Sequence, residues 1–262
     1  MICACFVACA TLSAPLPKGQ KGAQAEQLAQ KVLTALNAQA FFAAEGATWQ
    51  FRDHHYVWHK TLNRVRLQLE DELFVYVDLN LQKGWAFKAQ QRLKPKAESE
   101  AVKKAIKAFN NDSFWAFAPF KINDLGTQRA LVKSLPAYPA DKQLNDKQST
   151  DKQLNDKHTG TPSLLVFYES GGSTPGDHYL WHLDQQYRPY EWQMWVSIIP
   201  IGGTSSRWAQ WKQTKSGAWV AQEHNLGFIT FEVKNIEVVT RFEELGIQDS
   251  KLIDPWPKDL SF

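Results

Sequence analysis

The chain has 262 residues, of which 44% are hydrophobic and 22% are charged, so it can bury a sizeable core. Its net charge is only +3, and basic residues are scattered among acidic ones. Because nucleic-acid binding needs a concentrated basic face, no nucleic-acid partner is expected. Eleven tryptophans are the unusual feature, since each indole adds a large apolar surface and one N–H group that needs a partner. This surplus favours a cavity lining, a membrane-facing rim or a sugar platform in addition to a core.

The first residues have the character of a targeting segment. All three cysteines, Cys3, Cys5 and Cys9, lie there, so the rest of the chain can hold neither a disulfide nor a cysteine-based zinc site. The sequence "FVAC" ending at Cys9 is similar to a bacterial lipobox, in which the cysteine is lipidated. Phe6 replaces the usual leucine and no basic segment precedes it, which fits a leader that begins upstream. A lipoprotein signal is preferred, while a soluble-secretion signal and an ordinary cytosolic N-terminus stay open.

The first half of the chain alternates between helical and strand periodicity. Apolar residues spaced three and four apart predict an amphipathic helix over residues 24–44. From Trp49 the period changes to two, which predicts strands, with a tight hairpin at Asp71-Glu72. Helical spacing returns over residues 98–110, and a dense aromatic patch around Pro119 follows it.

The second half is expected to be a meander of strands. Residues 141–160 hold a polar tandem repeat, "DKQLNDKQST" and "DKQLNDKHTG", which predicts a solvated loop inserted between strands. Turn-rich segments then separate seven short strands, an arrangement typical of a barrel or a sandwich. By alternation, Trp192 and Trp195 should lie on opposite faces, and so should Trp208 and Trp211. The predicted strands are 164–168, 178–183, 191–199, 206–213, 218–224, 229–233 and 236–242.

Two histidine clusters could carry chemistry. His54 and His55 lie in one strand pattern, and Asp177 and His178 lie in another. Histidines four apart share a metal ion on a helix, but four residues of a strand span roughly 13 Å, so a site here needs residues from adjacent strands. A metal-dependent or acid–base hydrolase using these four residues is therefore one alternative. Local hydrogen bonding at the surface or rim of the sheet is the preferred interpretation.

The aromatic residues are the stronger signal. They could fill the interior of a barrel completely, or they could line a cleft that holds an acyl chain. A glycan-binding β module, with exposed tryptophans stacked on sugars, is a further alternative. The residues expected to line an apolar cleft are Trp49, Phe51, Trp58, Trp115, Phe117, Phe120, Tyr179 and Trp181.

Several segments together resemble a known family. A helix, a strand entering through "HHYVWHKTLNRVRL", a helix running into "FWAFAPFKINDLG" and a later "TPGDHYLWHLD" are similar to uncharacterised bacterial secreted proteins related to the lipoprotein-sorting carriers LolA and LolB. The resemblance covers most of residues 24–240 except the repeat, and "APFK" and "TPGDHY" are its most specific pieces. The enlarged loop departs from these carriers, and the lipobox-like N-terminus resembles LolB more than the soluble carrier LolA.

The resemblance implies an α+β fold in which a strongly curved antiparallel sheet forms a half-open β-barrel, with helices covering its concave face. Trp115, Phe117 and Phe120 would then belong to the helical lid, and Tyr179 and Trp181 to a strand of the sheet. The expected function is non-catalytic binding of an acyl chain or lipoprotein lipid in the periplasm, without a cofactor, by a protein anchored to the envelope membrane or soluble. The expected segments are a signal and linker at 1–20, one domain at 21–248 and a tail at 249–262.

Overall fold

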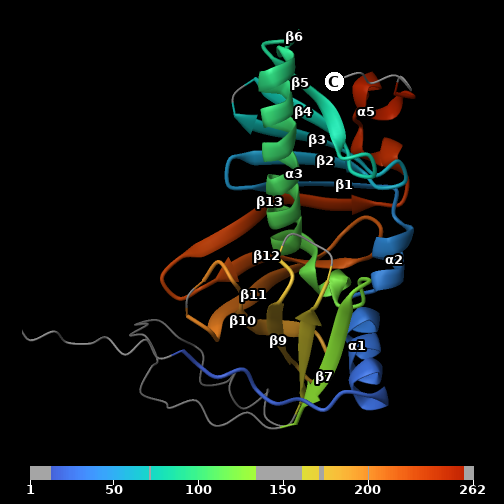
Figure 1. The fold of residues 1–262 in the computed structure, drawn as a ribbon. Coiled ribbons are helices and arrows are strands. Elements are labelled where there is room, and N and C mark those ends of the chain that lie inside the picture. Colours follow the sequence, from blue (N-terminus) through green and yellow to red (C-terminus); the bar gives the residue numbers. More distant parts are fainter. Residues whose placement is uncertain (1–12, 71, 134–160, 171–173, 200, 257–262) are drawn as a thin grey trace, which may run out of the picture.

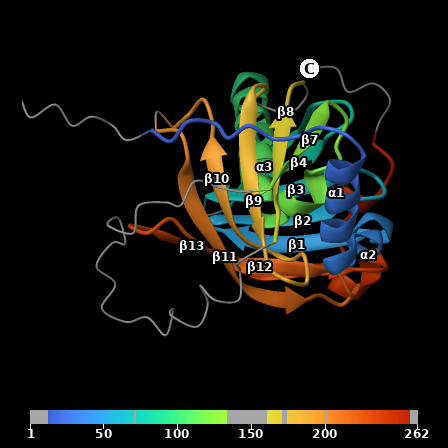
Figure 2. The same ribbon diagram turned by 90° about the horizontal axis from the view of Figure 1, so that it is seen from below.

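The computed structural model describes residues 13–70, 72–133, 161–170, 174–199 and 201–256, so Cys9 and the repeat at 141–160 lie outside the described residues. Thirteen antiparallel strands form one sheet, in the order β6-β5-β4-β3-β2-β1-β13-β12-β11-β10-β9-β8-β7. The sheet is not closed, and it curves around a long helix, α3 (Figures 1 and 2). The predicted α+β class with a large, open antiparallel sheet is confirmed. The strands are β1 Gly46–Phe51, β2 His54–His59, β3 Arg64–Glu70, β4 Leu73–Asp78, β5 Lys83–Lys88, β6 Gln91–Arg92, β7 Thr127–Val132, β8 Ser163–Tyr168, β9 Asp177–Leu183, β10 Pro189–Trp195, β11 Thr204–Gln213, β12 Trp219–Asn225 and β13 Thr230–Val239.

The chain builds the sheet as two meanders joined at its centre. Strands β1 to β6 run outward to one edge, and α3 (Pro95–Phe117) then crosses the sheet toward the other edge, where β7 begins (Figure 1). Strands β8 to β13 return to the centre, where β13 pairs with β1. The face of the sheet that contacts α3 is called the inward face below, and the opposite face is called the outward face.

The first predicted helix is two helices in the structure. Helix α1 (Ala23–Ala35) and helix α2 (Ala38–Ala43) are separated at Asn37, whose φ of 51° lies in the left-handed region. The carbonyl of Leu36 accepts a hydrogen bond from the backbone N–H of Trp219 at 3.0 Å, and Asn37 Nδ2 donates to the carbonyl of Gly217 at 3.1 Å. These contacts to the β11–β12 turn replace the hydrogen bonds of a continuing helix.

Helix α3 is longer than the sequence pattern predicted. It begins at Pro95, because proline at the first helical position has no N–H group to leave unpaired. Glu98 in its first turn accepts two hydrogen bonds from Arg92, each of 2.8 Å. The helix continues through Phe114 and Trp115 because these side chains, predicted to lie in a separate aromatic patch, pack against the sheet.

The second half of the chain confirms the predicted meander with two differences. The strands predicted at 229–233 and 236–242 form one strand, β13, with a left-handed residue at Asn235. The prediction that Trp208 and Trp211 lie on opposite faces is wrong. Gln210 between them has a φ of 53°, which interrupts the alternation, and the two rings lie 6.3 Å apart.

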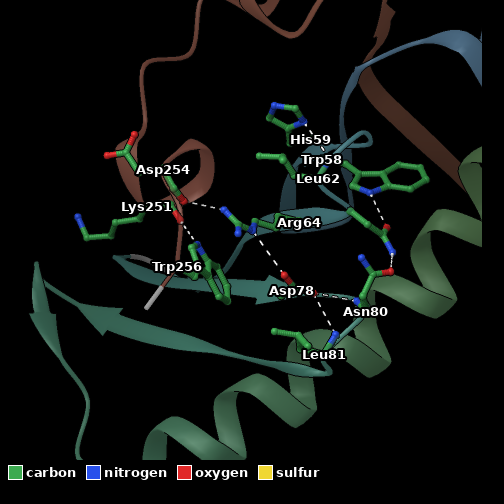
Figure 3. Close-up of polar contacts among 11 residues, drawn as sticks. Trp58, His59, Leu62, Arg64, Asp78, Asn80, Leu81, Lys251, Asp254 and Trp256 are labelled. Carbon is green, nitrogen blue, oxygen red and sulfur yellow. Dashed lines mark hydrogen bonds and ion pairs between the residues drawn. The ribbon is translucent and has the colours of Figure 1, made fainter. Parts of the chain in front are cut away.

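The outward face carries the C-terminal segment. Short helices η3 (Phe242–Leu245) and α5 (Ser250–Ile253) lie over this face, and Trp256 packs on Trp85 with ring centroids 4.3 Å apart. Arg64 donates to the carbonyl of Asp254 at 2.7 Å, and its guanidinium lies 4.8 Å from the centroid of the Trp256 ring (Figure 3). The segment after 248, predicted as a tail, is therefore part of the packed fold up to Trp256. Among the helices of the described residues, none has the length and apolar character needed to cross a bilayer.

Candidate functional site: an aromatic interior

Aromatic side chains of the inward face, of α3 and of the short helices α2 and η1 (Ala118–Lys121) form one continuous cluster, called the aromatic interior here. All eight residues predicted to line an apolar cleft belong to it, six of them buried and two, Trp58 and Trp115, half-buried. The structure therefore brings together residues that are up to 132 positions apart in the sequence, from Trp49 to Trp181. Other members of the aromatic interior include Phe41, Tyr56, Phe109, Phe114, Tyr168, Trp192, Trp208, His224 and Phe231.

Helix α3 contributes the side of the aromatic interior that faces the sheet. Near β1 and β2, the centroid of the Phe117 ring lies 5.1 Å from that of Trp49. Near β9 and β10, the Phe114 ring lies 5.0 Å from Tyr179, and the Trp115 ring lies 5.2 Å from Trp192. One helix thus contacts both halves of the sheet through rings only a few residues apart in its last turns.

Side chains fill the aromatic interior in this structure. Phe41 stacks on Phe120 with centroids 4.1 Å apart, and Trp208 lies 4.3 Å from His224, so neighbouring rings are in van der Waals contact. Two surface hollows lie elsewhere: one of about 260 Å³ on the outward face beside His55, and one of about 450 Å³ beside α3 at Lys107. Where these rings are in contact, a ligand would need α3 and the sheet to move apart.

Buried polar atoms without a partner among the described residues gather on strands β9 to β12. Six of the ten such atoms lie there: the indole nitrogens of Trp181, Trp192 and Trp208, the hydroxyl of Ser206 and both ring nitrogens of His224. The other four are Trp49 Nε1, Trp85 Nε1, Tyr168 Oη and Arg188 Nε. Each such group costs about 1–3 kcal/mol when it is buried unpaired, and native proteins keep few of them. A cluster of five residues of this kind is therefore unfavourable for stability alone.

Two tryptophans outside the aromatic interior have a hydrogen-bond acceptor for the indole N–H group. The indole N–H of Trp195 donates to the carbonyl of Ala14, and that of Trp256 donates to the carbonyl of Lys251, each at 2.8 Å. At the rim of the interior, Trp58 Nε1 donates to Asn63 Oδ1 at 3.4 Å (Figure 3). Unpaired indoles are thus concentrated inside, although Trp85 on the outward face is also unpaired.

His224 is the most unusual of these side chains. It is fully buried, with Trp208 on one side and the Trp115 ring 5.5 Å away on the other. Burial lowers the pKa of its imidazole to about 3, so the ring is neutral at physiological pH. Sequence reasoning placed residues 218–224 in a strand but missed His224, and its pairing with Trp208 across β11 and β12 could not be read without the register.

The four residues of the hydrolase alternative are not brought together. Strands β2 and β9 lie six strand spacings apart in the sheet, about 29 Å along it. His54 Nδ1 lies 2.8 Å from Asp112 Oδ2, whereas His55 borders the outward hollow. Asp177 accepts the backbone N–H of Ser197 at 3.0 Å. His178 contacts Phe167, with ring centroids 5.0 Å apart.

The glycan alternative needs exposed tryptophans. All eleven tryptophans lie in the described residues, and each is buried or half-buried. The exposed large apolar side chains are instead aliphatic residues and phenylalanines, such as Leu125, Phe228 and Ile198. Flat indole faces of the kind that stack on sugars are therefore turned inward or covered.

Comparisons with known proteins give distant structural similarity. No protein-family model matches the chain, and no curated protein matches it. A DUF1329 family protein from Desulfovibrio piger is 6% identical, with a TM-score of 0.40 over 87% of this chain and 96% of that one. A protein from Vibrio parahaemolyticus, described as an outer membrane lipoprotein-sorting domain, is 9% identical, with a TM-score of 0.33 over 86% of this chain and 97% of that one.

Proposed function

We propose that the protein is a non-catalytic carrier that binds an acyl chain, or the lipid of a lipoprotein, in the aromatic interior between α3 and the inward face. The observation that carries this proposal is the convergence of the eight cleft residues on one cluster between the helices and the inward face. Burial alone would drive binding, because each methylene removed from water contributes about 0.8 kcal/mol.

The way α3 is attached supports its role as a movable cover. Each strand pairs with its neighbours in the sheet, so a displacement of α3 breaks no strand ladder. Polar links between α3 and the sheet include Glu98 with Arg92 near the beginning of the helix and Asp112 with His54 near its end. Ring contacts, such as those of Phe114 with Tyr179 and of Trp115 with Trp192, also join the helix to the sheet.

Quenching of tryptophan fluorescence by a brominated acyl chain tests this proposal, because bromine quenches an indole only at close range. We expect dibrominated stearate to quench the protein saturably, and unbrominated stearate to compete with it. Trp192→Phe removes an indole of the aromatic interior and should reduce the quenched fraction. Trp85→Phe removes an indole of the outward face and should leave the quenched intensity unchanged. An absence of saturable quenching in the natural protein would contradict the proposal.

We also propose that a lipid on Cys9 anchors the protein to an envelope membrane on its periplasmic side. Ala14 N–H donates to the carbonyl of Gly202, and the backbone N–H of Gly202 donates to Ser13 Oγ, each at 2.9 Å. The start of the described chain is thus bound to the β10–β11 turn.

Exposed apolar side chains at this end of the sheet support membrane proximity. Ile198 on the β10–β11 turn is 72% exposed, and Phe228 on the β12–β13 turn is 83% exposed. Both turns project on the same side of the molecule as the start of the described chain (Figures 1 and 2). Cell fractionation with mass spectrometry of the N-terminal peptide tests the anchor. Cys9→Ser should move the protein from the membrane to the soluble fraction, and an unchanged distribution would rule the anchor out.

A further inference from the structure

Five side chains of the aromatic interior that carry unpaired polar groups lie on four adjacent strands, and the strand register brings them together. Trp181 lies opposite Trp192, and Trp192 lies opposite Ser206, so these three form one row across β9, β10 and β11. Trp208 lies opposite His224 in the next row. Ring contacts connect the rows, with centroids of Trp192 and Trp208 4.9 Å apart and those of Trp181 and Trp208 5.2 Å apart.

These five side chains, called the polar subsite below, are almost all hydrogen-bond donors. An indole nitrogen can only donate, a serine hydroxyl donates and accepts, and a neutral imidazole donates from one of its nitrogens. Three indoles, one hydroxyl and one imidazole thus offer up to five donors within one patch of the inward face. A ligand group that satisfies them has to be an oxygen acceptor.

The charge of the polar subsite distinguishes between possible acceptors. None of its five members is a lysine or arginine, and burial keeps His224 neutral. The guanidinium of Arg188 lies over the Trp211 and Trp219 rings, 5.7 and 4.3 Å from their centroids, and neither ring belongs to the subsite. A carboxylate in the subsite would therefore be removed from water without a counter-charge among the five side chains, which is strongly unfavourable. A neutral ester carbonyl needs donors but no counter-charge, so it is the acceptor that fits.

We propose that Trp181, Trp192, Ser206, Trp208 and His224 form a binding subsite for the ester carbonyl of an acyl ligand, which presupposes the acyl-binding function proposed above. The acyl chain would extend from this subsite along Trp115 toward the rings of Trp49 and Phe117. The ligand class is therefore an esterified lipid, because each ester carbonyl oxygen can accept from two of these donors without carrying a charge. A hydrocarbon accepts from none of them, and an ionised fatty acid brings a negative charge into the subsite.

Three probes of equal chain length test this subsite: methyl laurate, laurate and dodecane. We expect the natural protein to bind methyl laurate at least about tenfold more tightly than dodecane, since one good hydrogen bond is worth roughly that factor. Laurate should bind more weakly than the ester at neutral pH. With a ¹³C label on the ester carbonyl, its infrared stretching band should move to lower frequency on binding, as expected for a hydrogen-bonded carbonyl.

Substitutions separate a binding role from a structural one. Ser206→Ala and His224→Phe should each weaken methyl laurate binding about tenfold, while dodecane binding stays the same. The ligand-free variants should melt at the same temperature as the natural protein or higher, because an unpaired buried polar group has been removed. Trp85→Phe, which removes an unpaired indole on the outward face, is the matched control and should leave binding of all three probes unchanged.

The outcomes distinguish this inference from the function on which it depends. If dodecane and methyl laurate bind equally well, the ester subsite is wrong and an apolar cleft remains. If none of the three probes binds, the acyl-binding function fails as well. If the two substitutions lower the melting temperature and weaken all three probes alike, these side chains are structural and the subsite is also wrong.

Discussion

The carboxylate oxygen Oδ2 of Asp112 on α3 lies 2.8 Å from Nδ1 of His54 on β2, which joins the helix to the inward face. Tyr56 on the same strand donates a hydrogen bond to this oxygen, and Asn111 Nδ2 donates to the other carboxylate oxygen at 2.8 Å. Burial, together with the nearby Asp112 carboxylate, raises the pKa of the Tyr56 hydroxyl well above its usual range. The buried Asp112 therefore links α3 to strand β2 across the aromatic interior.

Removal of this carboxylate should both destabilise the protein and loosen α3. We expect Asp112→Ala to lower the free energy of unfolding by about 2–4 kcal/mol, because it leaves the buried Tyr56 hydroxyl unpaired. If α3 is the cover of the binding site, the same variant should also take up an acyl chain faster. Urea unfolding and stopped-flow fluorescence measure the two effects.

The neighbouring Asn111 provides the control for Asp112. Its side chain is exposed and contributes one hydrogen bond to the cluster, so Asn111→Ala should cost less than about 1 kcal/mol. If Asp112→Ala is as stable as the natural protein, the contacts of Asp112 with strand β2 do not hold α3 in place. If Asp112→Ala is destabilised but binds an acyl chain at the same rate as the natural protein, the Asp112 link stabilises the fold without controlling ligand entry.

Much of the fold follows from the sequence because periodicity is a local property. The alternation of Val65, Leu67 and Leu69 places them on the inward face, and Glu72, in the predicted turn, adopts a left-handed conformation between β3 and β4. The breaks at Asn37 and Gln210 could not be predicted in the same way. The break at Asn37 depends on hydrogen bonds to a turn about 180 residues away, and no local pattern marks Gln210 as left-handed.

The aromatic interior was predicted in part because large aromatic residues must be buried somewhere. The eight residues chosen from the sequence lie in it, but Trp208, His224 and Phe114 were not chosen. Their position depends on which strands are neighbours and on the rotation of α3 about its axis. Whether side chains fill the interior is decided by three-dimensional packing, and the sequence left both possibilities open.

The buried imidazole of His224 should make the protein sensitive to acid. Its pKa is about 3 in the folded protein, against 6.5 for a free side chain. Between these values the unfolded chain binds a proton that the folded protein does not, so stability falls as the pH is lowered from 6.5 toward 3. The loss attributable to this residue is about 3 kcal/mol between pH 6.5 and pH 4.

Comparison with His224→Phe isolates this effect from that of other titrating groups. Chemical unfolding of both proteins at several pH values should show the natural protein losing stability more steeply toward acid than the variant. Parallel curves would show that His224 can be protonated in the folded state without cost.

Lys60 should give a pH dependence at the alkaline side. Its ammonium group donates to the carbonyl of Phe41 and lies 4.2 Å from the centroid of the Phe41 ring, and burial lowers its pKa to about 8. Between pH 8 and the ordinary value of 10.5, the unfolded chain holds the proton and the folded protein does not. Stability should therefore rise with pH through this window, and Lys60→Met should remove that rise.

Ionisation of Tyr76 changes stability in the opposite direction from Lys60, but only at higher pH, so the two effects on stability can be measured separately. Burial and the nearby Asp249 raise the pKa of the Tyr76 hydroxyl to about 12, which lowers stability as the pH rises from 10 to 12. Urea unfolding at pH 7.5, 8.5 and 9.5 therefore reports mainly on Lys60. A natural protein whose midpoint does not rise relative to that of Lys60→Met over this range would show that the amine keeps an ordinary pKa.

The Trp256 side chain should matter for stability but not for binding. It is 9% exposed and packs between Trp85 and the guanidinium of Arg64 on the outward face, away from the aromatic interior. We expect Trp256→Ala to lower the free energy of unfolding by about 2–4 kcal/mol, since it removes a large buried ring. Ile253→Ala, on the same short segment but 39% exposed, should cost less than about 1 kcal/mol. Acyl-chain affinity should be the same in both variants, and a weaker affinity in Trp256→Ala would place the ligand on the outward face instead.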